Sequence, residues 1–186
     1  MLLQASRSHL LIVDTQGRLV PAVADSDRVL RNETVLLQAA GRLGIPVTVL
    51  EEYPEGLGPT VAAIADALPP GAVTLPKIAF SGAAEPVVAN RIAELRSEGR
   101  DQLVVAGMEA HVCVLQTALG FRAEGLSVAV VGDAVSSRSP HSVSAACARL
   151  LHAGCQWVTT EMVVFEWLAR AATDEFRALS ALIKTP

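Results

Sequence analysis

Three reactive side chains, Asp14, Lys77 and Cys113, each follow a short apolar run of the chain. The runs cover residues 10–13, 73–75 and 102–106, in that order. A cysteine thiolate is a nucleophile, an aspartate can accept and return a proton, and a lysine ammonium stabilises negative charge beside it. Brought together, these groups can carry out acyl transfer through a thioester.

The thiol needs help to react, because a cysteine with a pKa near 8.5 is only about 3% thiolate at neutral pH. Cys113 is predicted to lie in the first turn of a helix, where free N–H groups and the helix dipole favour an anion. With Lys77 nearby, we expect the thiol pKa to fall by about two units, which requires roughly 2.7 kcal/mol. Asp14 would be the general base, and backbone N–H groups of residues 107–113 could form an oxyanion hole.

Each residue of the three also has a structural interpretation. Cysteines are among the most buried residue types, aspartates cap helices and form turns, and lysines are usually solvated. His111 is an alternative base because Cys–His pairs are common, but it need not face Cys113 from two positions away. We interpret Asp133, after the fifth apolar run, as a loop or cap residue, and Cys147 and Cys155 as structural.

Short apolar strands alternate with helices along the chain. Strands are predicted over residues 10–13, 45–50, 73–75, 102–106, 126–131 and 157–158. Helices are predicted over residues 27–43, 58–68, 86–96, 112–124 and 141–153, with two more from residue 161. Continuous apolar strands are typical of a parallel sheet that is buried on both faces. This predicts an α/β, three-layer Rossmann-like fold, with a mostly parallel sheet of about six strands and helices on both faces.

Such a sheet also predicts where chemistry takes place. Ligands of open α/β sheets bind beyond the carboxyl ends of the strands. Asp14, Lys77 and Cys113 all leave this edge, and it is the coincidence of the three that favours a site. The first loop reads DTQGRL and lacks GxGxxG, so a dinucleotide is not expected there.

Composition limits the class of protein further. The 186 residues, 51% of them hydrophobic, predict one domain over 1–186 with a real core. A formal net charge of -4 gives no reason to expect nucleic acid or a membrane surface as partner. No apolar run approaches the ~20 residues of a membrane span, and no signal peptide is recognised. The 3 cysteines, an odd number, favour reduced thiols and a cytoplasmic location.

The motifs LLIVDTQ, PKIAFS and GMEAHVCVLQTAL resemble the isochorismatase-like cysteine hydrolases, which include nicotinamidases and related amidases. The segment EEYPEGLGPT resembles one branch of that superfamily, and the resemblance spans nearly the whole chain. It implies a triad in which Cys113 is the nucleophile, Asp14 the base and Lys77 the charge that stabilises the thiolate. It further implies a cis peptide bond between Met108 and Glu109, and an oxyanion hole made by the backbone N–H groups of Glu109 and Cys113.

This chain differs from the nicotinamidases in the residues that bind their metal. They bind it through an aspartate and two histidines beyond the second strand, whereas LEEYPEGLG contains no histidine. We therefore expect no catalytic metal, no cofactor and a small-molecule substrate other than nicotinamide. The residues whose positions suggest that they line the pocket are Gln16, Leu19, Tyr53, Phe80 and His111.

The sequence thus predicts a metal-independent cysteine hydrolase that cleaves a small-molecule amide or related C–N bond through a thioester. Isochorismatases of this fold can hydrolyse a vinyl ether without the cysteine, so Cys113 favours acyl chemistry. The alternative is a non-catalytic binding or scaffold protein that retains the fold. The apolar late helices favour a homo-oligomer, a dimer or larger, although the same residues could simply fill the core.

Overall fold

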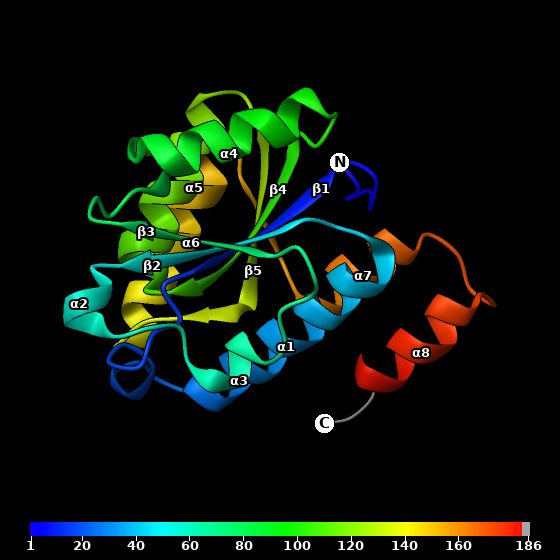
Figure 1. Cartoon of the computed structure of the whole chain (residues 1–186), viewed down its shortest axis with the longest axis horizontal. Helices are drawn as coiled ribbons and strands as arrows, with labels where there is room; N and C mark the ends of the chain where they lie inside the picture. The colour runs from blue at the N-terminus through cyan, green and yellow to red at the C-terminus, as the bar shows by residue number, and fades with distance from the viewer. Residues whose placement is uncertain (184–186) are drawn as a thin grey trace.

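Six strands form one sheet through the centre of the molecule, and every neighbouring pair is parallel (Figure 1). The computed structural model describes residues 1–183, so the last three residues of the predicted domain lie outside the described part. The strands are β1 (Ser8–Val13), β2 (Val47–Glu52), β3 (Val73–Lys77), β4 (Gln102–Met108), β5 (Ser127–Ser136) and β6 (Gln156–Val158). Their order across the sheet is β3-β2-β1-β4-β5-β6.

Helices cover both faces of this sheet. They are α1 (Ser26–Leu43), α2 (Pro54–Leu57), α3 (Ala62–Ala65), α4 (Pro86–Ser97), α5 (Leu115–Ala123), α6 (Pro140–His152), α7 (Thr160–Leu168) and α8 (Asp174–Ile183). Alternate residues of β1 face opposite sides: Leu10 and Ile12 pack with α1, α7 and α8, whereas Leu11 packs with α4, α5 and α6 (Figure 1). The predicted three-layer α/β fold is confirmed. Among residues 1–183, no helix is both long and apolar enough to cross a bilayer.

The strand order reverses between β1 and β4, which creates the crevice where this fold binds ligands. Val13, the last residue of β1, is in register with Gly107 near the end of β4. Gly107 has φ 122°, and a Cβ there would lie 2.0 Å from the Val13 carbonyl oxygen. Only glycine fits, so the two strands approach closely just below the predicted site.

Three predicted elements differ from the structure. Within residues 58–68 only the short helix α3 forms, because Gly58 adopts φ 80° after α2 and Thr60 then bridges to Gln16. The helix expected over 112–124 begins instead with a π-helical turn, Ala110–Val114, before α5. The fifth strand continues to residue 136 through an irregularity in its pairing with β4.

Candidate active site

Asp14 and Lys77 form an ion pair at the carboxyl edge of the sheet. Asp14 directly follows β1 and has φ 54°, while Lys77 ends β3. The Lys77 Nζ lies 2.8 Å from Asp14 Oδ2, and both side chains are completely shielded from solvent. Buried charges of opposite sign are stable only when paired in this way, so the two residues hold each other in place.

Glu52 is a third member of this cluster, and the sequence analysis missed it. Its Oε2 lies 2.6 Å from Lys77 Nζ, and the residue is buried. Glu52 ends β2, which lies between β1 and β3, and it is in register with Lys77. Its position two residues after the second predicted strand, 45–50, was a signal in the sequence, since the same edge carries Asp14 and Lys77.

Cys113 reaches the cluster from the π-turn after β4. Cys113 is only 6% exposed to solvent. Its Sγ and one carboxylate oxygen each of Asp14 and Glu52 all lie within 4.8 Å of one another. The structure therefore brings together Asp14, Lys77 and Cys113, which the sequence separates by up to 99 positions (113 - 14).

The electrostatics of the cluster differ from the expectation for the thiol. Burial, followed by the charge of Asp14, raises the pKa of Cys113 above its ordinary value, and Lys77 opposes this only in part. The predicted lowering of the thiol pKa is therefore wrong. Cys113 lies in a buried π-turn facing two carboxylates, not at the open start of an α-helix, so negative charge on sulfur is disfavoured.

The two partners of the thiol also have shifted pKa values. Burial raises the pKa of Asp14 to about 6, although the Lys77 ammonium pulls in the other direction. Burial lowers the pKa of Lys77, but the charges of Asp14 and Cys113 outweigh it, and the net shift is upward. At neutral pH the cluster therefore holds an ionised Asp14, a charged Lys77 and a protonated thiol.

The backbone beside Cys113 has a cis peptide bond between Met108 and Glu109, at the position that the resemblance implies. The chain leaves β4 there, and the Glu109 carbonyl accepts hydrogen bonds from the N–H groups of Val112 at 3.0 Å and Val114 at 3.3 Å. These bonds fold the π-turn around the Glu109 peptide.

Comparisons with known proteins identify the family of the chain. The isochorismatase domain family matches residues 8–162. The chain belongs to the isochorismatase family. It is 35% identical to isochorismatase domain-containing protein 2 of Danio rerio over 186 residues, covering 99% of this chain and 90% of that protein. It is 32% identical to isochorismatase domain-containing protein 2A of Mus musculus, covering 96% of this chain and 84% of the mouse protein.

A solved structure of similar fold is that of the MAR1 ribonuclease of Caenorhabditis elegans. It superimposes with a TM-score of 0.92 at 30% sequence identity, over 100% of this chain and 93% of that one. The isochorismatase family assignment supports a hydrolase role for the chain.

The predicted pocket residues lie in different environments. Gln16 is fully buried, and its amide bonds to the backbone of Glu52 and Gly58, so it holds loops together and presents no polar group to a ligand. Leu19 packs, half-buried, in a small cluster with Met108. His111 Nδ1 faces Ser137 Oγ at 3.0 Å, which favours Asp14 over His111 as the base.

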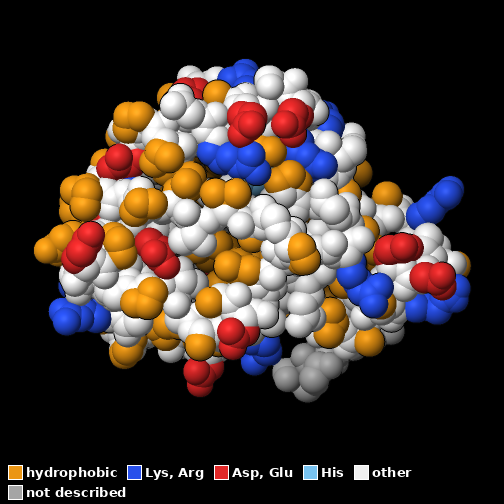
Figure 2. Space-filling model, in the orientation of Figure 1, with side chains coloured by type: hydrophobic (Ala, Val, Ile, Leu, Met, Phe, Trp, Pro, Cys, Tyr) orange, Lys and Arg blue, Asp and Glu red, His pale blue; other side chains and the backbone are white. Residues whose placement is uncertain are grey.

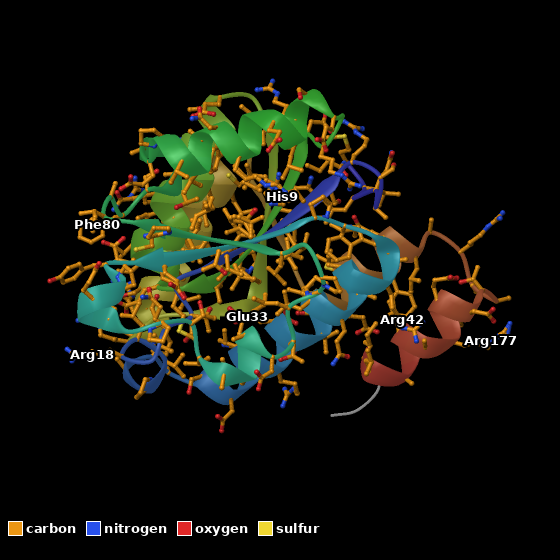
Figure 3. All side chains as sticks on the ribbon, in the orientation of Figure 1. His9, Arg18, Glu33, Arg42, Phe80 and Arg177 are labelled. Atoms are coloured by element: carbon orange, nitrogen blue, oxygen red, sulfur yellow. The ribbon has the colours of Figure 1, made fainter. Side chains whose placement is uncertain are left out.

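Tyr53 and Phe80 are exposed, at 53% and 55%. They follow the ends of β2 and β3, and Figure 3 shows Phe80 projecting outward from the loop after β3. Hydrophobic side chains are visible at this edge of the molecule in Figure 2. Both aromatic residues therefore flank the triad strands without entering the buried cluster.

Asp14, Glu52 and Cys113 have the atom types of a metal site, but a cation is already present among them. The Lys77 Nζ lies within 2.8 Å of a carboxylate oxygen of each acid. A divalent ion would have to displace this ammonium, so these three side chains do not fit a resident metal.

Proposed function

We propose that the protein is a metal-independent cysteine hydrolase that cleaves an amide or related C–N bond of a small molecule. The observation that carries the proposal is the buried cluster in which the Asp14 carboxylate pairs with the Lys77 ammonium and has an oxygen within 4.8 Å of the Cys113 thiol. Because Cys113 is only 6% exposed, the site suits a small substrate better than a polypeptide.

In the proposed first step, Cys113 Sγ attacks the carbonyl carbon while Asp14 accepts the thiol proton. The carbonyl electron pair moves to oxygen, and the backbone N–H groups of Glu109 and Cys113 stabilise that oxyanion. When the intermediate collapses, the C–N bond breaks and Asp14 returns the proton to the leaving amine. The product on the enzyme is a thioester at Cys113.

Water completes the reaction in the second step. Asp14 takes a proton from water, the hydroxide adds to the thioester carbon, and the sulfur leaves as thiolate and regains the proton. One amide and one water thus give one carboxylic acid and one amine. Since burial places the pKa of Asp14 at about 6, this carboxyl is close to the working pH, which suits a group that both accepts and donates protons.

Lys77 and Glu52 have supporting roles in this proposal. The Lys77 ammonium keeps Asp14 ionised and stabilises the sulfur whenever it carries negative charge. Glu52 bonds to the same ammonium at 2.6 Å from the neighbouring strand and so fixes its position. The role of Glu52 is therefore one of positioning, since its carboxylate meets Lys77 and not the reacting carbon.

The test is a screen of small amides, ureides and hydroxamates with intact-mass detection of an acyl adduct. Cys113→Ala should fold and lose turnover by orders of magnitude, whereas Cys155→Ala, which removes another buried cysteine, should retain it. Near-normal turnover by Cys113→Ala on a true substrate would refute the nucleophile assignment. Equal labelling of all three cysteines, or none, would favour the alternative of a non-catalytic scaffold.

The predicted homo-oligomer, a dimer or larger, also stays a proposal. The exposed apolar side chains Tyr53, Ile78 and Phe80 support it, because large apolar surface on a folded chain favours association. Light scattering after gel filtration tests it, and the mass of a single chain would contradict it. The cytoplasmic location remains a prediction from cysteine usage.

A further inference from the structure

The loop between β5 and α6, Ser137–Ser139, lies against the π-turn that carries Cys113. Two of its residues make contacts there, one on each side of Ala110. Arg138 donates from its backbone N and from its Nε to Glu109 Oε2, each at 3.1 Å. The Ser137 hydroxyl pairs with His111 Nδ1 at 3.0 Å. We call these contacts the π-turn clasp.

The loop that forms the π-turn clasp is itself anchored by hydrogen bonds. Ser137 is fully buried, and its carbonyl accepts a hydrogen bond from the Ala24 N–H at 3.0 Å. The Ser136 hydroxyl bonds to the Ala24 carbonyl, and Ser136 is itself in register with Met108. The loop is therefore anchored to the sheet and to the segment before α1, so it can act as a rigid support for the π-turn.

The side chain of Arg138 contributes little to the packing of the fold. Its side chain is 66% exposed, whereas that of Glu109 is only 12% exposed. Among residues 1–183, the Glu109 carboxylate is the group that accepts a hydrogen bond from the Arg138 side chain. An exposed arginine in a single ion pair contributes little to global stability, so the contact is better explained by what it does to Glu109.

We propose that Arg138 and Ser137 are positioning residues that hold the Glu109 peptide in the geometry needed to stabilise the oxyanion. This inference rests on the proposed function, in which the Glu109 N–H is one of the two donors. An oxyanion donor works only within a few tenths of an ångström of its place, because the charge it meets develops at one position. The clasp holds both residues that flank Ala110, and so prevents the peptide from rotating away.

Two chemical probes separate the positioning of the oxyanion donor from the reactivity of the thiol. A p-nitrophenyl ester acylates Cys113 through a tetrahedral oxyanion and releases p-nitrophenol. Iodoacetamide alkylates the same sulfur by displacing iodide, with no oxyanion on the path. The rate of each reaction is measured at Cys113 by peptide mass spectrometry, which excludes labelling of the other cysteines.

Arg138→Ala should lower the rate of acylation by about 10-fold or more and leave alkylation within about twofold of the wild type. Ser137→Ala should act in the same direction, and Arg138→Lys should recover part of the loss, because lysine restores the positive charge beside Glu109 while the backbone donor is present in both variants. Arg170→Ala, which removes an exposed arginine on another loop, is the matched control and should change neither rate.

Wild-type acylation rates in both Arg138→Ala and Ser137→Ala would overturn the clasp. So would a parallel fall of acylation and alkylation, because that result indicates general loss of structure. If the wild type itself is alkylated but never acylated at Cys113, the proposed hydrolase function fails first and the clasp fails with it. The wild-type reaction thus distinguishes the two failures.

Discussion

Glu33 carries a buried carboxyl group that lies beyond the triad, on the side of α1 that faces the sheet (Figure 3). Its Oε1 accepts a hydrogen bond from the Thr15 hydroxyl at 2.9 Å, and Thr15 is the residue after Asp14. Its Oε2 has no hydrogen-bond partner among the described residues. Burial raises the pKa of Glu33 to about 8, with the Thr15 hydrogen bond opposing the shift. The folded protein therefore holds Glu33 protonated at neutral pH.

This proton makes stability depend on pH. Between about pH 5 and pH 7.5 the folded chain keeps it, whereas an unfolded glutamate with its ordinary pKa near 4.3 has lost it. Since the folded state binds one more proton, the free energy of unfolding falls by about 1.4 kcal/mol for each unit of rising pH. The contribution is fully present below the unfolded pKa and is lost as pH approaches about 8.

Glu33→Gln removes this term, because the amide has nearly the shape of the protonated acid and does not ionise. Urea unfolding of both proteins is measured at pH 5.5, 6.5 and 7.5. From the lowest to the highest pH, the free energy of unfolding of the variant should rise relative to that of the wild type by about 3 kcal/mol. Glu98→Gln, on an exposed carboxylate, controls for the loss of one formal charge. A difference between wild type and Glu33→Gln that is the same at all three pH values would refute the reasoning.

Three further predictions concern the site and its support. Because burial raises the pKa of Asp14 to about 6, kcat/KM should rise as pH increases through about 6, and Asp14→Asn should abolish turnover at every pH tested. Lys77→Met leaves two buried carboxylates without their cation, so chemical denaturation should show a loss of about 3–5 kcal/mol, and a loss under 1 kcal/mol would contradict the buried pair. Gly107→Ala places a Cβ 2.0 Å from the Val13 carbonyl oxygen, so thermal melting should show strong destabilisation, whereas Gly17→Ala, which meets no atom within 4 Å, should melt close to the wild type.

The fold and the clustering of Asp14, Lys77 and Cys113 could be predicted because they depend on local patterns. Apolar runs without alternation identify strands buried on both faces, and a parallel sheet then sends the residues after each strand to one edge. Asp14, Lys77 and Cys113 were found in this way without knowledge of the strand order. The helix predicted over 27–43 likewise ends where expected, because Gly44 with φ 64° follows the last residue of α1.

The pairing of Glu52 with Lys77, and the π-turn, could not be found in the same way. The role of Glu52 depends on β2 lying between β1 and β3, and the alternation of strands and helices does not give the lateral order. The π-turn is hidden because the apolar spacing of residues 112–124 is compatible with an ordinary helix. Asp133, interpreted as a loop or cap residue, lies instead within β5, and its Oδ1 accepts from the N–H and hydroxyl of Thr160 at the start of α7, at 2.8 and 2.9 Å.

The wrong expectation for the thiol pKa follows first from the burial of Cys113 and then from the carboxylates that face it, to which Glu52 adds a second. With one carboxylate and one ammonium near the sulfur, the two charges would cancel and a helix end could favour a thiolate. The actual cluster has two carboxylates and one ammonium, so an ionised Cys113 would add a second net negative charge inside a buried site. In the proposed mechanism the proton therefore stays on sulfur until attack on the substrate, when Asp14 accepts it and the new charge moves to the carbonyl oxygen, where backbone donors can meet it. In such a site the reactivity of the nucleophile depends on the oxyanion donors, which is why the geometry of the Glu109 peptide, and the residues that hold it, should govern the rate.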